Sequence, residues 1–168
     1  MKKVTQEELK LILEEGEGYL VEFKEKLSRI DDEIVAFANG AGGRLLLGVR
    51  DDGTVKGISI TNKLKSQVQD IVNNCEPQIR IDLQELDSIL IIHVWPGGEK
   101  PYHCSSGFYL RVGPNTQKMK RQQIIEMFQA EGKIRFEELV DSKFDYPEDL
   151  SSDKLNHFLQ ASGISRSL

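Results

Sequence analysis

Residues 20–58 read LVEFKEKLSRIDDEIVAFANGAGGRLLLGVRDDGTVKGI, and this stretch decides the fold. Alternating apolar and polar residues over 20–24 predict a half-buried strand. We expect the helix that follows to end at Asn39-Gly40, a pair suited to a left-handed cap. The mainly apolar run over 44–49 then predicts a central strand of a sheet. A strand, a helix and a second strand thus form the core of the predicted domain.

The rest of the chain adds helices and strands around this core. Asp51-Asp52-Gly53 predicts a hairpin turn into a strand over 54–58. Thr5 and Glu8 have capping-box spacing, which predicts an N-terminal helix. Hydrophobic periodicity predicts further helices over 64–72, 121–131 and 155–159, and strands over 79–83, 89–94 and 108–112. This mixed order favours an α+β domain in which helices flank a mixed β-sheet.

The charge distribution divides the chain into two parts. Residues 131–168 carry 5 basic and 8 acidic residues, and the hydrophobic pattern weakens there. We expect residues 1–130 to form one domain. We expect residues 131–168 to form an acidic connector with a short helix, leading to a further C-terminal region.

Composition excludes several classes of protein. No apolar run approaches the roughly 18 residues needed to cross a bilayer, so no membrane partner is expected. The N-terminus has lysines but no apolar h-region, which excludes a signal peptide and favours a cytoplasmic location. Cys75 and Cys104 are expected to be reduced thiols. The formal net charge of −5 argues weakly against a nucleic-acid partner, although its distribution matters more.

Three acidic residues in or beside the opening stretch are candidates for a metal site. Glu17, Glu22 and Asp51 could converge, and converging carboxylates repel one another unless they share a cation. Mg²⁺ or Mn²⁺ prefers oxygen ligands and can activate water for phosphodiester cleavage. Lys24 shares a strand face with Glu22 and is suited to stabilise negative charge on a phosphate. The alternative, which spacing alone favours, is that the glutamates are solvated and Asp51 serves the turn.

Two other patterns do not indicate a site. The glycine-rich segment 40–43 runs from a helix into a strand, whereas phosphate loops run from a strand into a helix. No ATPase motif of the form GxxxxGK[ST] occurs in the chain. Four possible zinc ligands match no standard spacing and are expected to be structural: His93, His103, Cys75 and Cys104.

A basic stretch lies toward the end of the domain. Residues 110–121 contain no acid, and their charged residues are Arg111, Lys118, Lys120 and Arg121. Backbone amides at the start of the following helix would add to the attraction for phosphate. Three nearby aromatic residues are suited to stack on bases: Tyr102, Phe108 and Tyr109. A solvated helix edge with the aromatic residues in the core is an equally open alternative.

Five groups of short motifs follow one another through most of the chain. They are Glu22-Phe23-Lys24; Ala36-Phe37-Ala38-Asn39 with Gly42-Gly43; Gly48-Val49 with Asp51 and Gly53; Lys100-Pro101-Tyr102; and Tyr109-Leu110-Arg111-Val112-Gly113. As an ordered set they resemble the Schlafen/AlbA-like domain family, over about residues 8–130. The resemblance implies an AlbA-like/Schlafen core and a nucleic-acid partner.

The resemblance also implies two settings for the domain. In bacteria it is the N-terminal piece of transcriptional regulators, ahead of an ATPase-like or winged-helix region. In animal Schlafen proteins a related domain is a metal-dependent ribonuclease that acts on transfer and ribosomal RNA. Its three catalytic acids match Glu17, Glu22 and Asp51 by motif position, whereas its zinc ligands find no match here. That nuclease uses two tandem copies of the domain, for which a homodimer could substitute.

Three hypotheses about function therefore stay open. The first is a DNA- or RNA-binding module of a bacterial transcriptional regulator, with phosphate contacts from Lys24, Arg44, Arg111, Lys118, Lys120 and Arg121. The second is a ribonuclease in which Glu17, Glu22 and Asp51 hold Mg²⁺ or Mn²⁺ and Lys24 assists. The third is a dimerisation or interaction domain. Acids gathered within about 5 Å around a metal-sized gap would favour the nuclease. Dispersed acids beside a basic surface would favour simple binding.

Overall fold

The computed structural model describes residues 2–133, 143–145 and 147–163. Contacts divide the chain into two compact units, Met1–Ile134 and Arg135–Leu168, and each is described by itself. Within the described ranges, no helix has the length and apolar character needed to cross a membrane.

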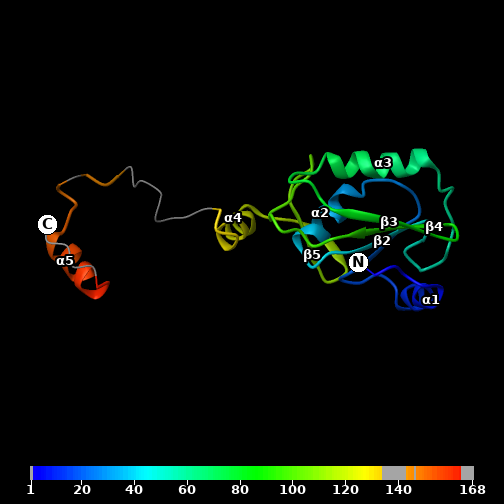
Figure 1. Ribbon diagram of the computed structural model, residues 1–168, viewed down its shortest axis with the longest axis horizontal. Helices are drawn as coiled ribbons and strands as arrows, with labels where there is room; N and C mark the ends of the chain where they lie inside the picture. Colours follow the sequence, from blue (N-terminus) through cyan, green and yellow to red (C-terminus); the bar gives the residue numbers. More distant parts are fainter. Residues whose placement is uncertain (1, 134–142, 146, 164–168) are drawn as a thin grey trace. The chain divides into compact units, whose positions relative to one another are not determined.

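A four-stranded mixed sheet forms the centre of the first unit (Figure 1). Its strands, in the spatial order β1-β2-β4-β3, are β1 (Val21–Lys24), β2 (Gly43–Leu47), β4 (Ile89–Val94) and β3 (Ile81–Leu86). β1 and β2 are parallel, whereas β4 runs antiparallel to both of its neighbours. The central strands β2 and β4 are almost entirely buried, because helices cover both faces of the sheet.

Helices lie on both faces of the sheet. α1 (Gln6–Glu15) lies on one face, and α2 (Asp31–Asn39) and α3 (Asn62–Asn73) lie on the other (Figure 1). Successive side chains of β2 therefore enter different cores: Leu46 packs on the α1 side, and Leu45 and Leu47 pack on the α2 and α3 side. Each fully buried leucine contributes about 1.5–3 kcal/mol to folding.

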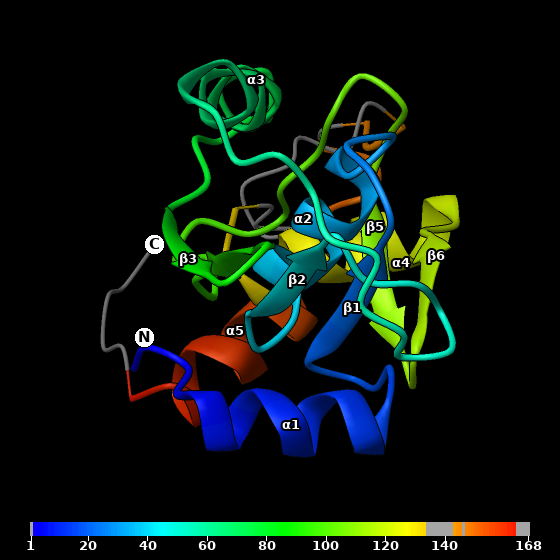
Figure 2. The same ribbon diagram turned by 90° about the vertical axis from the view of Figure 1, so that its right-hand side faces the viewer.

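A two-stranded hairpin packs beside β1. β5 (Tyr109–Val112) pairs antiparallel with β6 (Asn115–Lys118), and α4 (Arg121–Ala130) follows. Figure 2 shows the hairpin next to β1, on the side of the sheet opposite to β3. The buried amide of Asn39 joins it to α2 by donating to the carbonyl oxygens of Tyr102 and Tyr109, at 2.8 and 3.0 Å. This side chain therefore fixes where the hairpin sits on the helix.

The predicted α+β class is confirmed, and so are the helices and most strands. The capping box of Thr5 and Glu8 is present at the start of α1. The predicted strand over 54–58 is absent, because this segment makes one isolated bridge, between Val49 and Val55. β6 was not predicted, since its sequence NTQK lacks the apolar alternation of a strand.

The turn between α2 and β2 also differs from expectation. Gly40 has a φ of −91°, so it does not form the predicted left-handed cap. The left-handed residue is Gly42, with a φ of 81°. A Cβ at Gly42 would lie 2.7 Å from the carbonyl oxygen of Val94, so the turn needs glycine at this position.

The second unit contains α5 (Ser152–Ala161), which the sequence predicted in shorter form. Ser151 begins this helix, and its hydroxyl accepts a hydrogen bond from the amide of Lys154 at 3.4 Å. Residues 134–142 of the predicted acidic connector lie outside the described residues.

Candidate functional site

Glu22 lies on β1 and is buried among charged groups. Its side chain is 10% exposed and accepts hydrogen bonds from Lys24 Nζ at 2.7 Å and from Arg111 Nη1 at 2.6 Å. A carboxylate removed from water needs such partners, because desolvation disfavours its charged form. Both oxygens of Glu22 are thus engaged by cations of the protein itself.

Arg111 reaches this carboxylate from β5, and its side chain is 1% exposed. Besides Glu22, its guanidinium donates hydrogen bonds to the Thr116 hydroxyl and to the carbonyl oxygens of Gly18 and Pro114. We expected Arg111 to contact phosphate from the surface. In the structure this arginine instead joins the hairpin to β1, and it is not available to a ligand on the surface.

Lys24 bridges two carboxylates from different elements. Its Nζ lies 2.7 Å from an oxygen of Glu22 and 3.0 Å from an oxygen of Glu33, in the first turn of α2. Burial lowers the pKa of Lys24, but its hydrogen bonds to Glu22 and Glu33 outweigh burial and raise the pKa overall. Lys24 is therefore a firmly charged bridge between β1 and α2.

Glu17 lies just before β1 and turns back onto it. Its carboxylate accepts a hydrogen bond of 2.9 Å from the backbone amide of Phe23. Burial raises the pKa of Glu17, and repulsion from Glu22 and Asp51 adds to the increase. The three predicted acids thus share one neighbourhood, although Glu17 has a structural partner of its own.

The fit of Glu17, Glu22 and Asp51 to a divalent ion is poor. Among the residues that the structure describes, the group of ligand atoms that gathers within 4.8 Å belongs to Asp31, Asp32 and Cys104, and not to these three acids. Asp51 is exposed in the turn after β2, and the oxygens of Glu22 already have cationic partners. Ions such as Mg²⁺ need several oxygens near 2.1 Å, and these acids do not provide them as placed.

The group of Asp31, Asp32 and Cys104 lies at the start of α2. The Ser106 hydroxyl donates to Asp32, and burial raises the pKa of the Cys104 thiol. A protonated thiol is a weak metal ligand. Cys75 and Cys104 are free and buried, and His93 lies in the core.

The remaining predicted cations lie in two places. Lys118, Lys120 and Arg121 are exposed between the end of β6 and the start of α4. Lys118 Nζ donates to the carbonyl oxygen of Ser106, and the first turn of α4 contains no acid. Arg44 is half-buried on β2. The structure therefore separates the six predicted cations into buried bridges and surface groups.

The aromatic residues expected near the bases lie mostly inside the domain. Tyr102 is 5% exposed and Tyr109 is 9% exposed, and both belong to the α2 side of the core. Phe108 is half-buried and packs against Phe128 of α4, with ring centroids 6.4 Å apart. Tyr102 and Tyr109 thus lie in the core, whereas Phe108 is partly accessible.

Sequence reasoning missed Glu33 as a partner of Lys24. Its place in the first turn of α2 already has a local reason, since acids there suit the start of a helix. In the structure Glu33 is 9% exposed, and its Oε2 has no hydrogen-bond partner among the described residues. No spacing rule links Glu33 to Lys24, since one belongs to a helix and the other to a strand.

Comparison with known proteins identifies the domain. A family model described as Schlafen, AlbA_2 matches residues 17–120. The chain belongs to this family. Membership in the Schlafen/AlbA_2 family indicates a function related to nucleic acid.

One solved structure similar to this Schlafen/AlbA_2 chain is that of the DIP2311 protein from Corynebacterium diphtheriae. The TM-score is 0.52 at 19% identity, over 77% of this chain and 25% of that one. This chain thus corresponds to about a quarter of that protein, and the likeness shows the fold alone. No curated protein matches the chain.

Proposed function

We propose that this Schlafen/AlbA_2 domain binds DNA or RNA through the cations between β6 and α4. The proposal rests on one observation: Lys118, Lys120 and Arg121 are exposed within four consecutive residues. These residues lie at the end of β6 and the start of α4, whose first turn has no acid. Among the described residues, none of the three forms an ion pair within 4.0 Å. Their charges are available to an external anion.

The backbone supports the same role. The N-terminus of a helix presents amide donors and partial positive charge, both of which favour phosphate. Lysine and arginine side chains beside it would release counterions from a nucleic-acid backbone on binding. Such contacts position a ligand without reading its sequence. The setting in a bacterial transcriptional regulator is part of the proposal and rests on the family resemblance.

The proposal is tested by titrating a fluorescent oligonucleotide at low salt and following its anisotropy. The variant Lys118→Ala, Lys120→Ala, Arg121→Ala should bind at least tenfold more weakly than the unchanged protein. The matched control replaces three exposed lysines elsewhere, Lys3, Lys10 and Lys63, and should bind like the unchanged protein. Equal loss in the two triple variants would mean that net charge alone drives binding, and the proposed surface would be wrong.

A metal-dependent ribonuclease is the second candidate. It is favoured by one observation, that the carboxylate of Glu17 folds back onto β1, the strand that carries Glu22, by accepting a hydrogen bond from the amide of Phe23. Burial raises the pKa of Glu17, and repulsion from Glu22 and Asp51 adds to the increase. Their spacing does not fit a metal ion, so this candidate ranks below binding. RNA cleavage measured with Mg²⁺ and with Mn²⁺, in the unchanged protein and in Glu22→Gln and Asp51→Asn, decides it. Cleavage that persists in both variants would remove these acids from the mechanism.

A further inference from the structure

The four strands of the sheet bring four separate chain segments to one end. Leu20 immediately precedes β1, Arg44 is the second residue of β2, Trp95 follows β4, and Arg80 precedes β3. The register places Val21 opposite Arg44 and Val94 opposite both Gly43 and Ile81. With strands about 4.8 Å apart, the four segments form a row across the sheet end. We call Leu20, Arg44, Trp95 and Arg80 the strand-end row.

Three members of this row lie on one face of the sheet. Arg44 and Asp82 both pair in register with His93, so these side chains share a face. The indole Nε1 of Trp95 donates to Asp82 at 2.7 Å, which places Trp95 on the same face. Arg80 lies on this face as well, because its guanidinium lies 4.4 Å from the centroid of the Trp95 ring.

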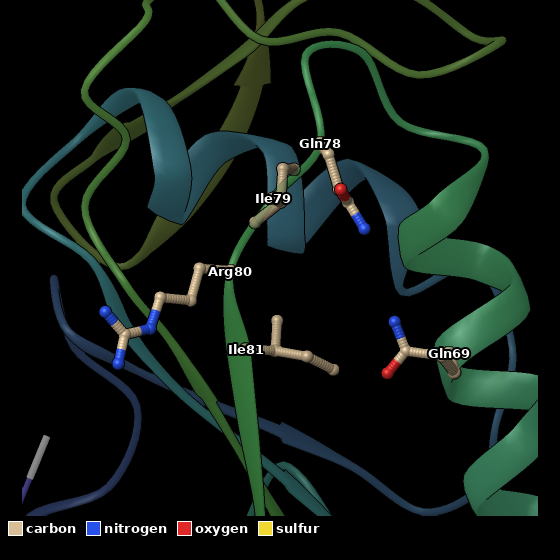
Figure 3. Close-up of a pocket in the computed structure, with 5 residues that line it drawn as sticks. All are labelled: Gln69, Gln78, Ile79, Arg80 and Ile81. Atoms are coloured by element: carbon tan, nitrogen blue, oxygen red, sulfur yellow. The ribbon is translucent and has the colours of Figure 1, made fainter.

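The guanidinium of Arg80 lies over the Trp95 ring, and such a pair is suited to a base. Figure 3 shows the Arg80 side chain extending to the other side of β3 from Gln69. Both residues line a hollow of about 320 Å³ between α3 and the start of β3. Unpaired bases stack on aromatic rings and on guanidinium planes, and here one group already covers the other.

Arg44 supplies a cation beside an open hollow. It lines a cavity of about 140 Å³ together with Leu20, Ala41 and the glycines of the turn after α2. The Nε of Arg44 is buried and has no hydrogen-bond partner among the described residues, and neither has Nδ1 of His93 opposite it. Arg44 is half-buried and forms no ion pair within 4.0 Å among the described residues, so its charge can attract an anionic acceptor at the hollow.

The acids near the row have partners within the protein. Asp82 accepts the hydrogen bond from Trp95, and the carboxylate of Glu8 on α1 accepts one from the amide of Thr5 at 3.0 Å. Leu20, which is 50% exposed, lies at the β1 end of the row, next to Val21, which shares the face of Arg44. The row thus offers two cations and one aromatic ring on one face of the sheet end.

We infer that the strand-end row binds single-stranded nucleic acid, with a base stacked on Arg80 and Trp95 and a phosphate at Arg44. A duplex fits poorly, since its bases are already stacked within the helix. This inference rests on the proposed function and deepens it, because the cations before α4 attract any phosphate backbone whereas the row selects unpaired strands.

Trp95 is the single tryptophan of the chain and reports on the row directly. Short oligomers of uridine and of thymidine, and a duplex of the same length, are titrated while the tryptophan emission and the anisotropy of a labelled strand are recorded. Both single strands should quench the emission in a saturable way, and the duplex should not. The comparison of the uridine and thymidine oligomers shows whether the row prefers RNA or DNA.

The variants separate the row from other sites. Arg80→Gln should weaken single-strand binding about fivefold to hundredfold, the range for loss of one stacked base. Trp95→Phe keeps an aromatic ring and should retain more affinity than Trp95→Leu, with circular dichroism confirming that each variant folds. The control is Arg50→Gln, because Arg50 is an exposed arginine beyond the other end of β2, paired with Glu25, and should leave affinity unchanged.

Four outcomes would overturn the inference, and they differ from one another. Single strands that bind without quenching and equally well in Arg80→Gln would exclude the row and leave the proposed function standing. Equal quenching by the duplex would exclude the preference for unpaired strands. Quenching by polyglutamate but by no oligonucleotide would indicate an acidic protein partner. Absence of any binding at low salt would defeat the proposed function and this inference together.

Discussion

Arg111 and Lys118 lie in facing strands of one hairpin and have opposite surroundings. Arg111 is buried and donates to a carboxylate, a hydroxyl and three carbonyl groups. Lys118, which pairs in register with Tyr109, is exposed and makes one hydrogen bond to a carbonyl oxygen. Two cations seven residues apart thus serve two purposes. One holds the hairpin to the sheet, and the other faces solvent, where a ligand can reach it.

The same contrast extends to the surrounding residues. Around Arg111, the charges of Glu22, Lys24 and Glu33 are paired within the protein. Beyond Lys118, the charges of Lys120 and Arg121 have no such partners among the described residues. The difference teaches that a count of basic residues in a stretch says little about binding until each charge has been traced to its partner.

Removal of the buried arginine should have the largest effect. Arg111→Met leaves the carboxylate of Glu22 with one cation and removes the donors to Gly18 and Pro114, and it should lower the free energy of unfolding by about 3–5 kcal/mol. Urea denaturation followed by circular dichroism measures this loss. Lys118→Met is the matched control on the facing strand and should stay within about 0.5 kcal/mol of the unchanged protein. Similar losses of unfolding free energy in both variants would contradict the contrast between Arg111 and Lys118.

Removal of the buried amide of Asn39 should have the second-largest effect on stability. Asn39→Ala leaves the carbonyl oxygens of Tyr102 and Tyr109 and the amide of Tyr102 without their partner. Each buried group left unsatisfied costs about 1–3 kcal/mol, so the total loss should be at least that large and below that of Arg111→Met. Urea denaturation is again the measurement, with Asn73→Ala on the exposed end of α3 as control. A variant as stable as its control would show that the hairpin is held without this amide.

The surface cations should change binding rather than folding. In the variant Lys118→Ala, Lys120→Ala, Arg121→Ala, log affinity should fall less steeply with log salt concentration. The magnitude of that slope should be smaller by about 2–3, since each phosphate contact contributes about 0.7–0.9 to it. The free energy of unfolding, measured by urea denaturation, should be nearly unchanged in this variant. A variant that binds weakly but keeps the original slope would show that these side chains do not contact phosphate.

A buried histidine gives the smallest effect, and it depends on pH. Burial and the nearby charge of Arg44 lower the pKa of His93 below its ordinary value of 6.5. The stability contributed by neutral His93 is therefore fully present above about pH 6.5 and is lost as the pH falls through the lowered pKa. The stability difference between the unchanged protein and His93→Gln should shrink between pH 7 and pH 5. A constant difference would contradict this assignment.

Local patterns were enough to predict the central elements of the fold. The apolar run of β2 and the capping box of Thr5 and Glu8 each carry their own physical reason within a few residues. The Gly40 cap was wrong because segment 40–43 contains three glycines, and contacts with Val94 select Gly42 for the left-handed position. Val94 belongs to β4, which lies far along the chain from this turn, so no local pattern could indicate the contact.

The candidate site was less predictable for the same reason. The pairing of Arg111 with Glu22 joins residues 89 positions apart, so no local pattern marks Arg111 as buried. Trp95 and Arg80 form their stack only because β3 and β4 are paired in one register. Lys118, Lys120 and Arg121 could be predicted as exposed, since they lie in a charged stretch that leads into a predicted helix.

The hydrogen bond between Glu17 and Phe23 has a consequence for assembly. β1 is an edge strand, and unpaired amides on an edge invite strands from other chains. The carboxylate of Glu17 occupies one of those amides, and Gly18 bridges back to Val21 beside it. A second molecule could therefore not extend the sheet past β1 without first displacing this segment.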